Sequence, residues 1–334
     1  GQSSATILVD VLGDNIVEVP ETVELTLTGT DHAAVTVPAT GNTASVTIND
    51  GVGQTTVSIA ATDATGSEPG ADDGLFTVSL SDGKLAPEGG IAVTYTVSGT
   101  ATSGSDYTAH TGTVTIPGGQ ATALIPVDVL DDNIVEVPET VIVTLTGSNH
   151  PGVTVAAANT TATVTIADDD PTTVSITATD AGGSEPGTDD GRFTVTLAGG
   201  KVAPPGGIIV NYSLSGAATA GSDYATLSGA VTIPAGASSA TISVDVLDDS
   251  IVELPETVLA TLTGTDHAGV TVGTTGNAAT VTITDDDPTT VSVVASDANG
   301  SEPGNDDGAF TVTLDSGKVA PTGGIAVTYT VAGT

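Results

Sequence analysis

The stretch ATVTIADDDP, residues 162–171, alternates apolar and polar residues and then ends in three aspartates and a proline. It recurs as ATVTITDDDP at 279–288, 117 residues later. Alternation with a period of two is typical of a half-buried β-strand, and a proline cannot continue the hydrogen-bonded ladder. We therefore expect a strand that ends at an acidic junction, with a new repeat starting directly after it.

Two further motifs recur at steps of 117 residues, apart from one step of 118 between 16–22 and 134–140. Ser-Glu-Pro-Gly begins at Ser67, Ser184 and Ser301, and Ile-Val-Glu-x-Pro-Glu-Thr occupies 16–22, 134–140 and 251–257. Self-similarity at a fixed period is the signature of a repeat protein. The chain divides into a C-terminal half repeat, two complete repeats and an N-terminal half repeat, at 1–54, 55–171, 172–288 and 289–334. We expect a segment of a longer chain; the alternative is that half repeats of neighbouring chains pair.

Each complete repeat contains seven short apolar runs separated by Gly, Asn, Asp or Pro. In the first complete repeat these runs are 57–59, 76–80, 91–97, 114–116, 125–129, 141–145 and 162–166. Seven short strands with turn residues between them indicate an immunoglobulin-like sandwich. We predict an all-β chain of tandem seven-stranded antiparallel β-sandwiches arranged end to end.

The composition narrows the possible partners. Forty-one acidic residues stand against four basic ones, which gives a formal net charge of −37. Such a surface repels nucleic acid and anionic lipid. The 38% content of hydrophobic residues argues against a disordered acidic tail, and no apolar stretch reaches the ~20 residues of a membrane span. Together with the absence of cysteine, this composition favours an extracellular or cell-surface protein of bacterial type.

The recurrent acids follow the ends of the expected strands. Strand ends gather at two poles of a sandwich, so carboxylates far apart in sequence can converge there. Several ionised carboxylates at close range repel one another strongly, and six to eight oxygen ligands are what calcium requires. We favour a calcium site at this pole; the alternative is that the acids are solvated turn residues, which Asp and Asn often are.

Four blocks of the first complete repeat resemble the Calx-β motif. They are GTATSGSDY (99–107), GTVTI (112–116), VLDDNIVEVPET (129–140) and ATVTIADDD (162–170). The family is known from sodium/calcium exchangers, integrin β4 and large bacterial surface proteins. The resemblance implies a seven-stranded sandwich of Calx-β type that binds Ca²⁺ at one pole, with more than one ion per complete repeat. The implied metal ligands are Glu68, Asp106, Asp131, Asp132, Glu136, Asp168, Asp169 and Asp170, and then Glu185, Asp223, Asp248, Asp249, Glu253, Asp285, Asp286 and Asp287.

The half repeats depart from this pattern. Gly13 stands where the first Asp of the Asp-Asp pair is expected, and Asn49-Asp50-Gly51 replaces the triple aspartate. We expect this first junction to be the weakest in calcium binding and the most flexible. The last half repeat keeps Glu302 but lacks the other blocks.

Catalysis has little support, because the acids recur in every repeat and no nucleophile–base arrangement or phosphate loop is present. We expect a calcium-binding rigid spacer of a large surface or adhesion protein, not an enzyme. Its partners would be neighbouring repeats of the same or of identical chains, with no nucleic acid and no membrane insertion, and an adhesive ligand would be bound by a different domain. The alternatives are a self-assembling extracellular filament and a calcium sensor attached to a membrane protein.

Overall fold

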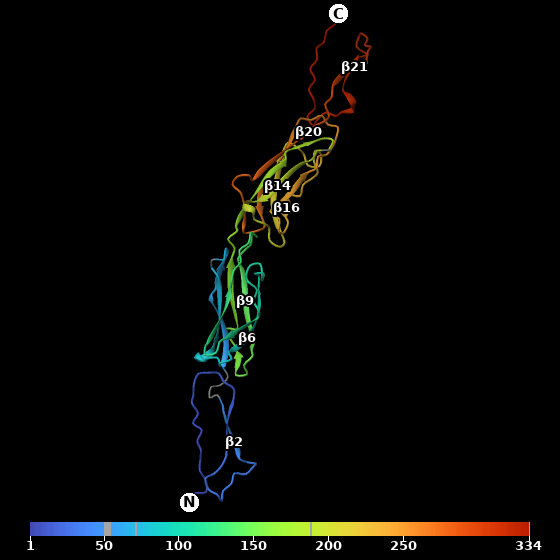
Figure 1. The fold of residues 1–334 in the computed structure, drawn as a ribbon. Coiled ribbons are helices and arrows are strands. Elements are labelled where there is room, and N and C mark those ends of the chain that lie inside the picture. The colour runs from blue at the N-terminus through green and yellow to red at the C-terminus, as the bar shows by residue number, and fades with distance from the viewer. Residues whose placement is uncertain (50–54, 71, 188, 334) are drawn as a thin grey trace. The chain divides into compact units, whose positions relative to one another are not determined.

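The computed structural model describes residues 1–49, 55–70, 72–187 and 189–333 (Figure 1). The chain forms two compact units, which we describe separately. Unit 1 contains Gly1–Asp132 and Val137–Asp169, and unit 2 contains Asn133–Glu136 and Asp170–Thr334. The short segment from Asn133 to Glu136 therefore packs with the repeat that follows it in sequence.

In unit 1, residues 55–132 and 137–169 form two facing sheets. The four-stranded sheet has the order β10-β3-β5-β8, with bounds Val153–Val155, Thr55–Asp63, Gly74–Leu80 and Thr122–Val127. The five-stranded sheet has the order β4-β11-β9-β6-β7, with bounds Thr65–Ser67, Thr161–Ala167, Glu139–Ser148, Ile91–Gly99 and Thr113–Ile116. The two sheets enclose one hydrophobic core.

In unit 2, residues 172–288 repeat this arrangement. One sheet has the order β19-β12-β14-β17, with bounds Val270–Val272, Thr172–Asp180, Gly191–Leu197 and Ser239–Val244. The other has the order β13-β20-β18-β15-β16, with bounds Gly182–Ser184, Ala278–Thr284, Glu256–Thr265, Ile208–Gly216 and Ala230–Ile233.

The remaining segments form two antiparallel strand pairs. These are β1 (Glu21–Thr26) with β2 (Thr43–Ile48), and β21 (Val291–Asp297) with β22 (Ala309–Leu314). Phe310 on β22 is 80% exposed, whereas the equivalent residues Phe76 and Phe193 are completely buried. Each pair is thus a sheet whose apolar face is not enclosed as it is in the complete repeats.

Among the residues that the structure describes, helical structure is confined to single 3₁₀ turns. They are η1 (Ser81–Gly83), η2 (Ala198–Gly200) and η3 (Asp315–Gly317). Within the described ranges, no helix is long and apolar enough to cross a membrane.

The predicted all-β class is confirmed, and strands lie on all seven predicted runs of each complete repeat. Each repeat has two further strands of three residues, β4 and β10 in unit 1 and β13 and β19 in unit 2. They pair in parallel with β11, β3, β20 and β12, so the sheets are mixed rather than purely antiparallel. Runs as short as Thr65-Gly66-Ser67 carry no measurable periodicity, which is why the sequence did not predict them.

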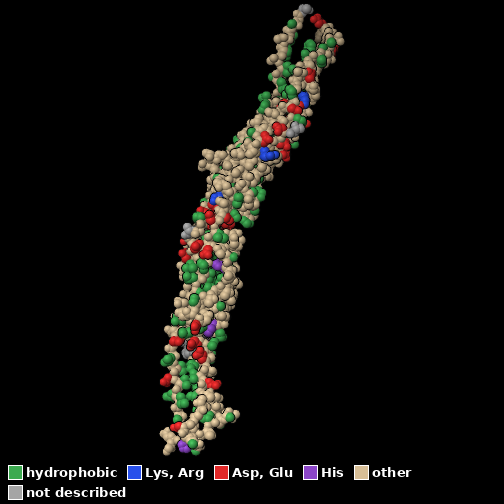
Figure 2. Space-filling model, viewed as in Figure 1, with side chains coloured by type: hydrophobic (Ala, Val, Ile, Leu, Met, Phe, Trp, Pro, Cys, Tyr) green, Lys and Arg blue, Asp and Glu red, His purple; other side chains and the backbone are tan. Residues whose placement is uncertain are grey.

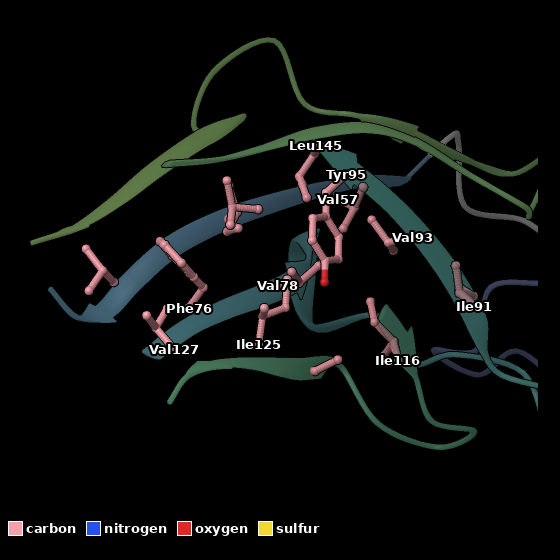
Figure 3. Packing of buried hydrophobic residues seen from close by; sticks show 14 of the residues in the cluster. Val57, Phe76, Val78, Ile91, Val93, Tyr95, Ile116, Ile125, Val127 and Leu145 are labelled. Carbon is pink, nitrogen blue, oxygen red and sulfur yellow. The ribbon is translucent and has the colours of Figure 1, made fainter. Parts of the chain in front are cut away.

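Alternate residues of the strands fill the core. Phe76 and Val78 on β5 and Ile125 on β8 lie on one side of the core, and Tyr95 and Val93 on β6 belong to the facing sheet (Figure 3). These side chains are at most 6% exposed. Fully burying an aliphatic or aromatic side chain contributes about 1.5–3 kcal/mol, so this core is the main source of stability in the repeat. The intervening Thr and Ser residues face outward.

The two sheets approach closely where Gly191 on β14 meets Val281 on β20. A Cβ at position 191 would lie 2.3 Å from Val281 Cγ1, and Gly74 has the same relation to Val164. The backbone of β14 therefore packs directly against a side chain of the facing sheet, which leaves no room for a methyl group.

We predict that Gly191→Ala lowers the free energy of unfolding by about 1–3 kcal/mol, because the added methyl group overpacks the contact with Val281. Gly182→Ala is the matched control, since a Cβ there meets nothing within 4 Å. Chemical denaturation of both variants measures the difference. Equal midpoints for the two variants would contradict the close approach.

Candidate metal centre

Sheet register brings acidic residues together at one end of the repeat 172–288. Strand β20 is antiparallel to β18 and pairs Ile283 with Glu256, the first residue of β18. It is parallel to β13 and pairs Thr284 with Ser184. The acids that follow these strands, Glu185 and Asp285, therefore leave the sheet at the same edge as Glu256.

Two groups of carboxylates lie at this edge, and each can direct three oxygen atoms toward one point. We name them the Glu185 cluster, formed by Glu185, Asp248 and Asp286, and the Glu256 cluster, formed by Asp223, Glu253 and Glu256. In each cluster one oxygen from every residue lies within 4.8 Å of the others. Asp and Glu side chains also gather in groups on the visible surface, whereas Lys and Arg are few (Figure 2).

Backbone N–H groups orient the acids in and around these clusters. The Glu253 amide donates to Asp285 Oδ2 over 2.9 Å, and the Asp287 amide donates to Asp285 Oδ1 over 3.0 Å. The Thr219 amide donates to Asp223 Oδ2 over 2.6 Å. Asp285 thus ties the loop that carries Glu253 to the end of β20, and Asp223 is held by its own loop.

The donor set fits a cation. Glu185 is 6% exposed, and its Oε2 atom is buried without a hydrogen-bond partner among the described residues. Glu256 Oε2 is likewise a buried oxygen atom without a hydrogen-bond partner among the described residues. A buried carboxylate oxygen without a partner loses its hydration and gains nothing in return, so a positive ion at either cluster would satisfy it.

Burial and mutual repulsion shift the pKa values of both key glutamates. Desolvation, reinforced by the charges of Asp249, Asp285, Glu253 and Asp248, raises the pKa of Glu185 to about 7. Desolvation also raises the pKa of Glu256 to about 7, together with the hydrogen bond and charge of Asp223. The pKa of Glu253 is raised by desolvation and by the nearby Asp223. With pKa values of about 7, Glu185 and Glu256 are partly protonated near neutral pH, and a bound cation would displace these protons.

The third aspartate of the triple-aspartate motif has a different environment. Asp287 is 3% exposed, forms an ion pair with Lys318, and belongs to neither cluster. Asp170, which is equally buried, forms the same pair with Lys201. The three aspartates thus have different roles. Asp286 belongs to the Glu185 cluster, Asp285 accepts hydrogen bonds from loop amides, and Asp287 forms an ion pair with Lys318.

The predicted ligands of the repeat 55–171 are divided between the units. Glu68, Asp131 and Asp169 form a group in unit 1 whose oxygens lie within 4.8 Å of one another, equivalent to the Glu185 cluster. Asp106, Asp132 and Asp168 also belong to unit 1, while Glu136 and Asp170 belong to unit 2. At the first junction, Asp50 and Gly51 lie outside the described residues, so the expectation of a weak site there stays a prediction.

Sequence reasoning missed Glu256 and its equivalent Glu139. Both occur in Ile-Val-Glu-x-Pro-Glu-Thr, and Glu21 shares the position in the first half repeat. The second glutamate of the motif recurs as regularly as the first, and this regularity was the available signal. Its place beside Glu253 only becomes clear from the register of β18 against β20.

The family model of the Calx-beta domain matches residues 1–52, 53–170 and 168–287. The chain belongs to the Calx-beta domain family. These matches cover both complete repeats and the first half repeat, which agrees with the resemblance in the sequence blocks.

Among solved structures, CBD12 from CALX1.2 matches at 19% identity over 68% of this chain and 99% of the other, with a TM-score of 0.29. The calcium binding domain CBD12 of CALX1.1 matches at 21% identity over 63% of this chain and 81% of the other, with a TM-score of 0.28. The Yersinia pseudotuberculosis adhesin InvE matches at 15% identity over 69% of this chain and 58% of the other, with a TM-score of 0.31. A search of curated protein sequences found no match.

The raised pKa values predict how stability depends on pH without calcium. A glutamate has a pKa near 4.5 in the unfolded chain and about 7 here, so its contribution to stability is complete below pH 4.5 and is lost as the pH rises through 7. We expect the melting temperature in chelator to fall between about pH 5 and pH 8. Glu185→Gln should reduce this fall, because glutamine does not ionise.

Calorimetry across this pH range measures the effect, with Glu88→Gln as a control that removes one exposed charge far from the clusters in sequence. A melting temperature that rises steadily to pH 8 in chelator, or an identical decline in Glu185→Gln, would contradict the assignment.

Proposed function

We propose that the chain is a calcium-binding structural segment of a large extracellular surface or adhesion protein, in which bound calcium makes consecutive repeats a rigid spacer. The observation that carries this proposal is the pair of clusters in the repeat 172–288. Six carboxylates converge there in two groups, and each group contains a buried glutamate oxygen without a hydrogen-bond partner among the described residues.

The chemistry of the donors favours calcium over other cations. Every member of the two clusters is a carboxylate, and neither cluster includes histidine, which zinc prefers. Calcium accepts six to eight oxygens in flexible geometry, whereas magnesium demands a near-ideal octahedron and retains several waters. Asp249 and Asp285 lie close enough to Glu185 to raise its pKa, so further carboxylates surround the first three.

A bound ion would supply positive charge where the repeat concentrates negative charge. Glu185, Asp248 and Asp286 would hold one ion, and Asp223, Glu253 and Glu256 a second. The residues come from loops that are distant in sequence, so ligation would tie the ends of β13, β17 and β20 to the start of β18. Chelation would release these loops and restore the repulsion among the acids.

The composition supports an extracellular location. The chain has a net charge of −37 and no cysteine. Without cysteine, its folding does not depend on disulfide formation or on a reducing compartment. Calcium sites of extracellular modules operate at dissociation constants of roughly 10⁻⁴ to 10⁻³ M, which suits carboxylate-rich loops on a repeat surface.

Calcium should stabilise the folded repeats. At a concentration a hundredfold above its dissociation constant, each bound ion contributes ~2.7 kcal/mol to the free energy of unfolding. Glu256→Gln should remove most of the contribution of the Glu256 cluster and lower the calcium stoichiometry by one ion. Titration calorimetry and thermal unfolding in calcium and in chelator measure both quantities.

The matched control is again Glu88→Gln, which removes the same charge from an exposed turn. It should bind calcium with the stoichiometry of the parent chain. If the melting temperature is the same in excess chelator and in millimolar calcium, the calcium-binding proposal fails.

The spacer role predicts that calcium narrows the range of distances between repeats. Because the chain has no cysteine, Thr115→Cys with Thr232→Cys places one dye on an exposed position of each complete repeat. We expect a broad distance distribution by single-molecule FRET in chelator and a narrow one in calcium.

The control pair, Thr115→Cys with Thr163→Cys, lies within one repeat and should not respond. If calcium binds but the distribution of distances between the repeats does not become narrower, the metal site is supported and the spacer role is excluded.

A further inference from the structure

We propose that the Ile-Val-Glu loop of each repeat is a docking segment that completes the hydrophobic core of the following repeat. The stability of each repeat would then depend on its N-terminal neighbour, independently of calcium. Four observations support this coupling: a recurrent backbone pairing, the burial of the loop valine, a glycine that faces this valine, and the position of the lysines.

The same backbone pairing occurs three times. The Val135 amide donates to Val202 O over 3.0 Å, and the Val202 amide donates to Asn133 O over 2.9 Å. Ile134 and Val202 form a parallel bridge, as do Ile16 with Leu85 and Ile251 with Val319. In each bridge the loop pairs with a residue 68 or 69 positions further along the chain, which belongs to the next repeat.

The valine of the loop is a core residue of that next repeat. Val135 is completely buried, and its cluster otherwise consists of residues from Val174 to Ile283. Val17 is 3% exposed and belongs in the same way to the core of the repeat 55–171. Val252, whose loop pairs with the segment that carries β21 and β22, is partly exposed in the described structure. The valine is therefore buried wherever a two-sheet core is present in the described structure to receive it.

A glycine of the receiving repeat allows this contact. A Cβ at Gly269 would lie 2.9 Å from Val135 Cγ1 and 3.1 Å from the carbonyl oxygen of Glu136. Gly152 has the same position next to Val17, with a corresponding distance of 3.4 Å to Val17 Cγ1. The receiving surface is therefore shaped for a branched side chain at this position.

The three lysines of the chain mark the receiving position. Lys84, Lys201 and Lys318 directly precede Leu85, Val202 and Val319, and one arginine is the only other basic residue. Lys201 pairs with Asp170 and Lys318 with Asp287, the last acid of the preceding repeat in each case. At Lys201-Val202 and Lys318-Val319 the dipeptide thus pairs with the loop through the valine backbone and with the preceding aspartate through the lysine charge.

The test uses hydrogen exchange of the full chain, read peptide by peptide. Val135→Ala should increase exchange about tenfold in the core strands of 172–288, the repeat to which Val135 does not belong in sequence, and leave 55–169 unchanged. Val252→Ala is the matched control and should have a much smaller effect. The difference should persist in chelator, which separates this proposal from the calcium-binding proposal.

A double-mutant cycle provides a second measurement. Gly269→Ala should cost less stability in the Val135→Ala background than in the parent chain, because removal of Cγ1 makes room for the new methyl group. Gly152→Ala, which faces Val17, should be additive with Val135→Ala. Faster exchange in 55–169 instead of 172–288, or additivity of Gly269→Ala with Val135→Ala, would overturn the proposal.

Discussion

The convergence of like charges at strand ends is the constraint on which the rest of this structure depends. The register of β20 against β18 and β13 requires the acids after these strands to leave the sheet at one edge. The acids come from loops far apart in sequence, so no local rearrangement of one loop can disperse them. At separations under 5 Å the repulsion amounts to several kcal/mol per pair at moderate effective dielectric. Any stable form of the repeat must offset it.

The structure offsets this repulsion in three ways. Backbone amides donate to Asp285 and Asp223, which spreads part of the negative charge into the loops. Glu185 and Glu256 take up protons near neutral pH, because desolvation raises their pKa values to about 7. Lys318 neutralises Asp287. The hydrogen bonds and the ion pair are permanent features of the fold, whereas a cation can displace the protons. The same carboxylates can therefore both repel one another and bind a cation.

The Ile-Val-Glu motif lies between a hydrophobic core and a carboxylate cluster. Its valine belongs to the core of the next repeat, while the glutamate beside it lies, in the case of Glu253, in a carboxylate cluster of its own repeat. One short loop therefore contributes to an apolar contact on one side and a polar site on the other. Nearest-neighbour contacts of this kind are the source of cooperativity in repeat proteins. Calcium would act on the polar side of the loop and core packing on its apolar side, so either contribution can be removed without the other.

The sequence by itself determined the strands, the repeat and most of the acid set, because these follow from alternation, turn residues and spacing along the chain. Only the tertiary structure decided which acids share a cluster, where Val135 is buried, and that Asp287 pairs with a lysine, because these depend on residues that are distant in sequence. Phe193 and Phe310 show the difference most simply. They occupy equivalent positions in similar strands, yet one is completely buried and the other is 80% exposed. Burial is decided by the sheet that packs on the opposite face, and no local sequence pattern encodes its presence.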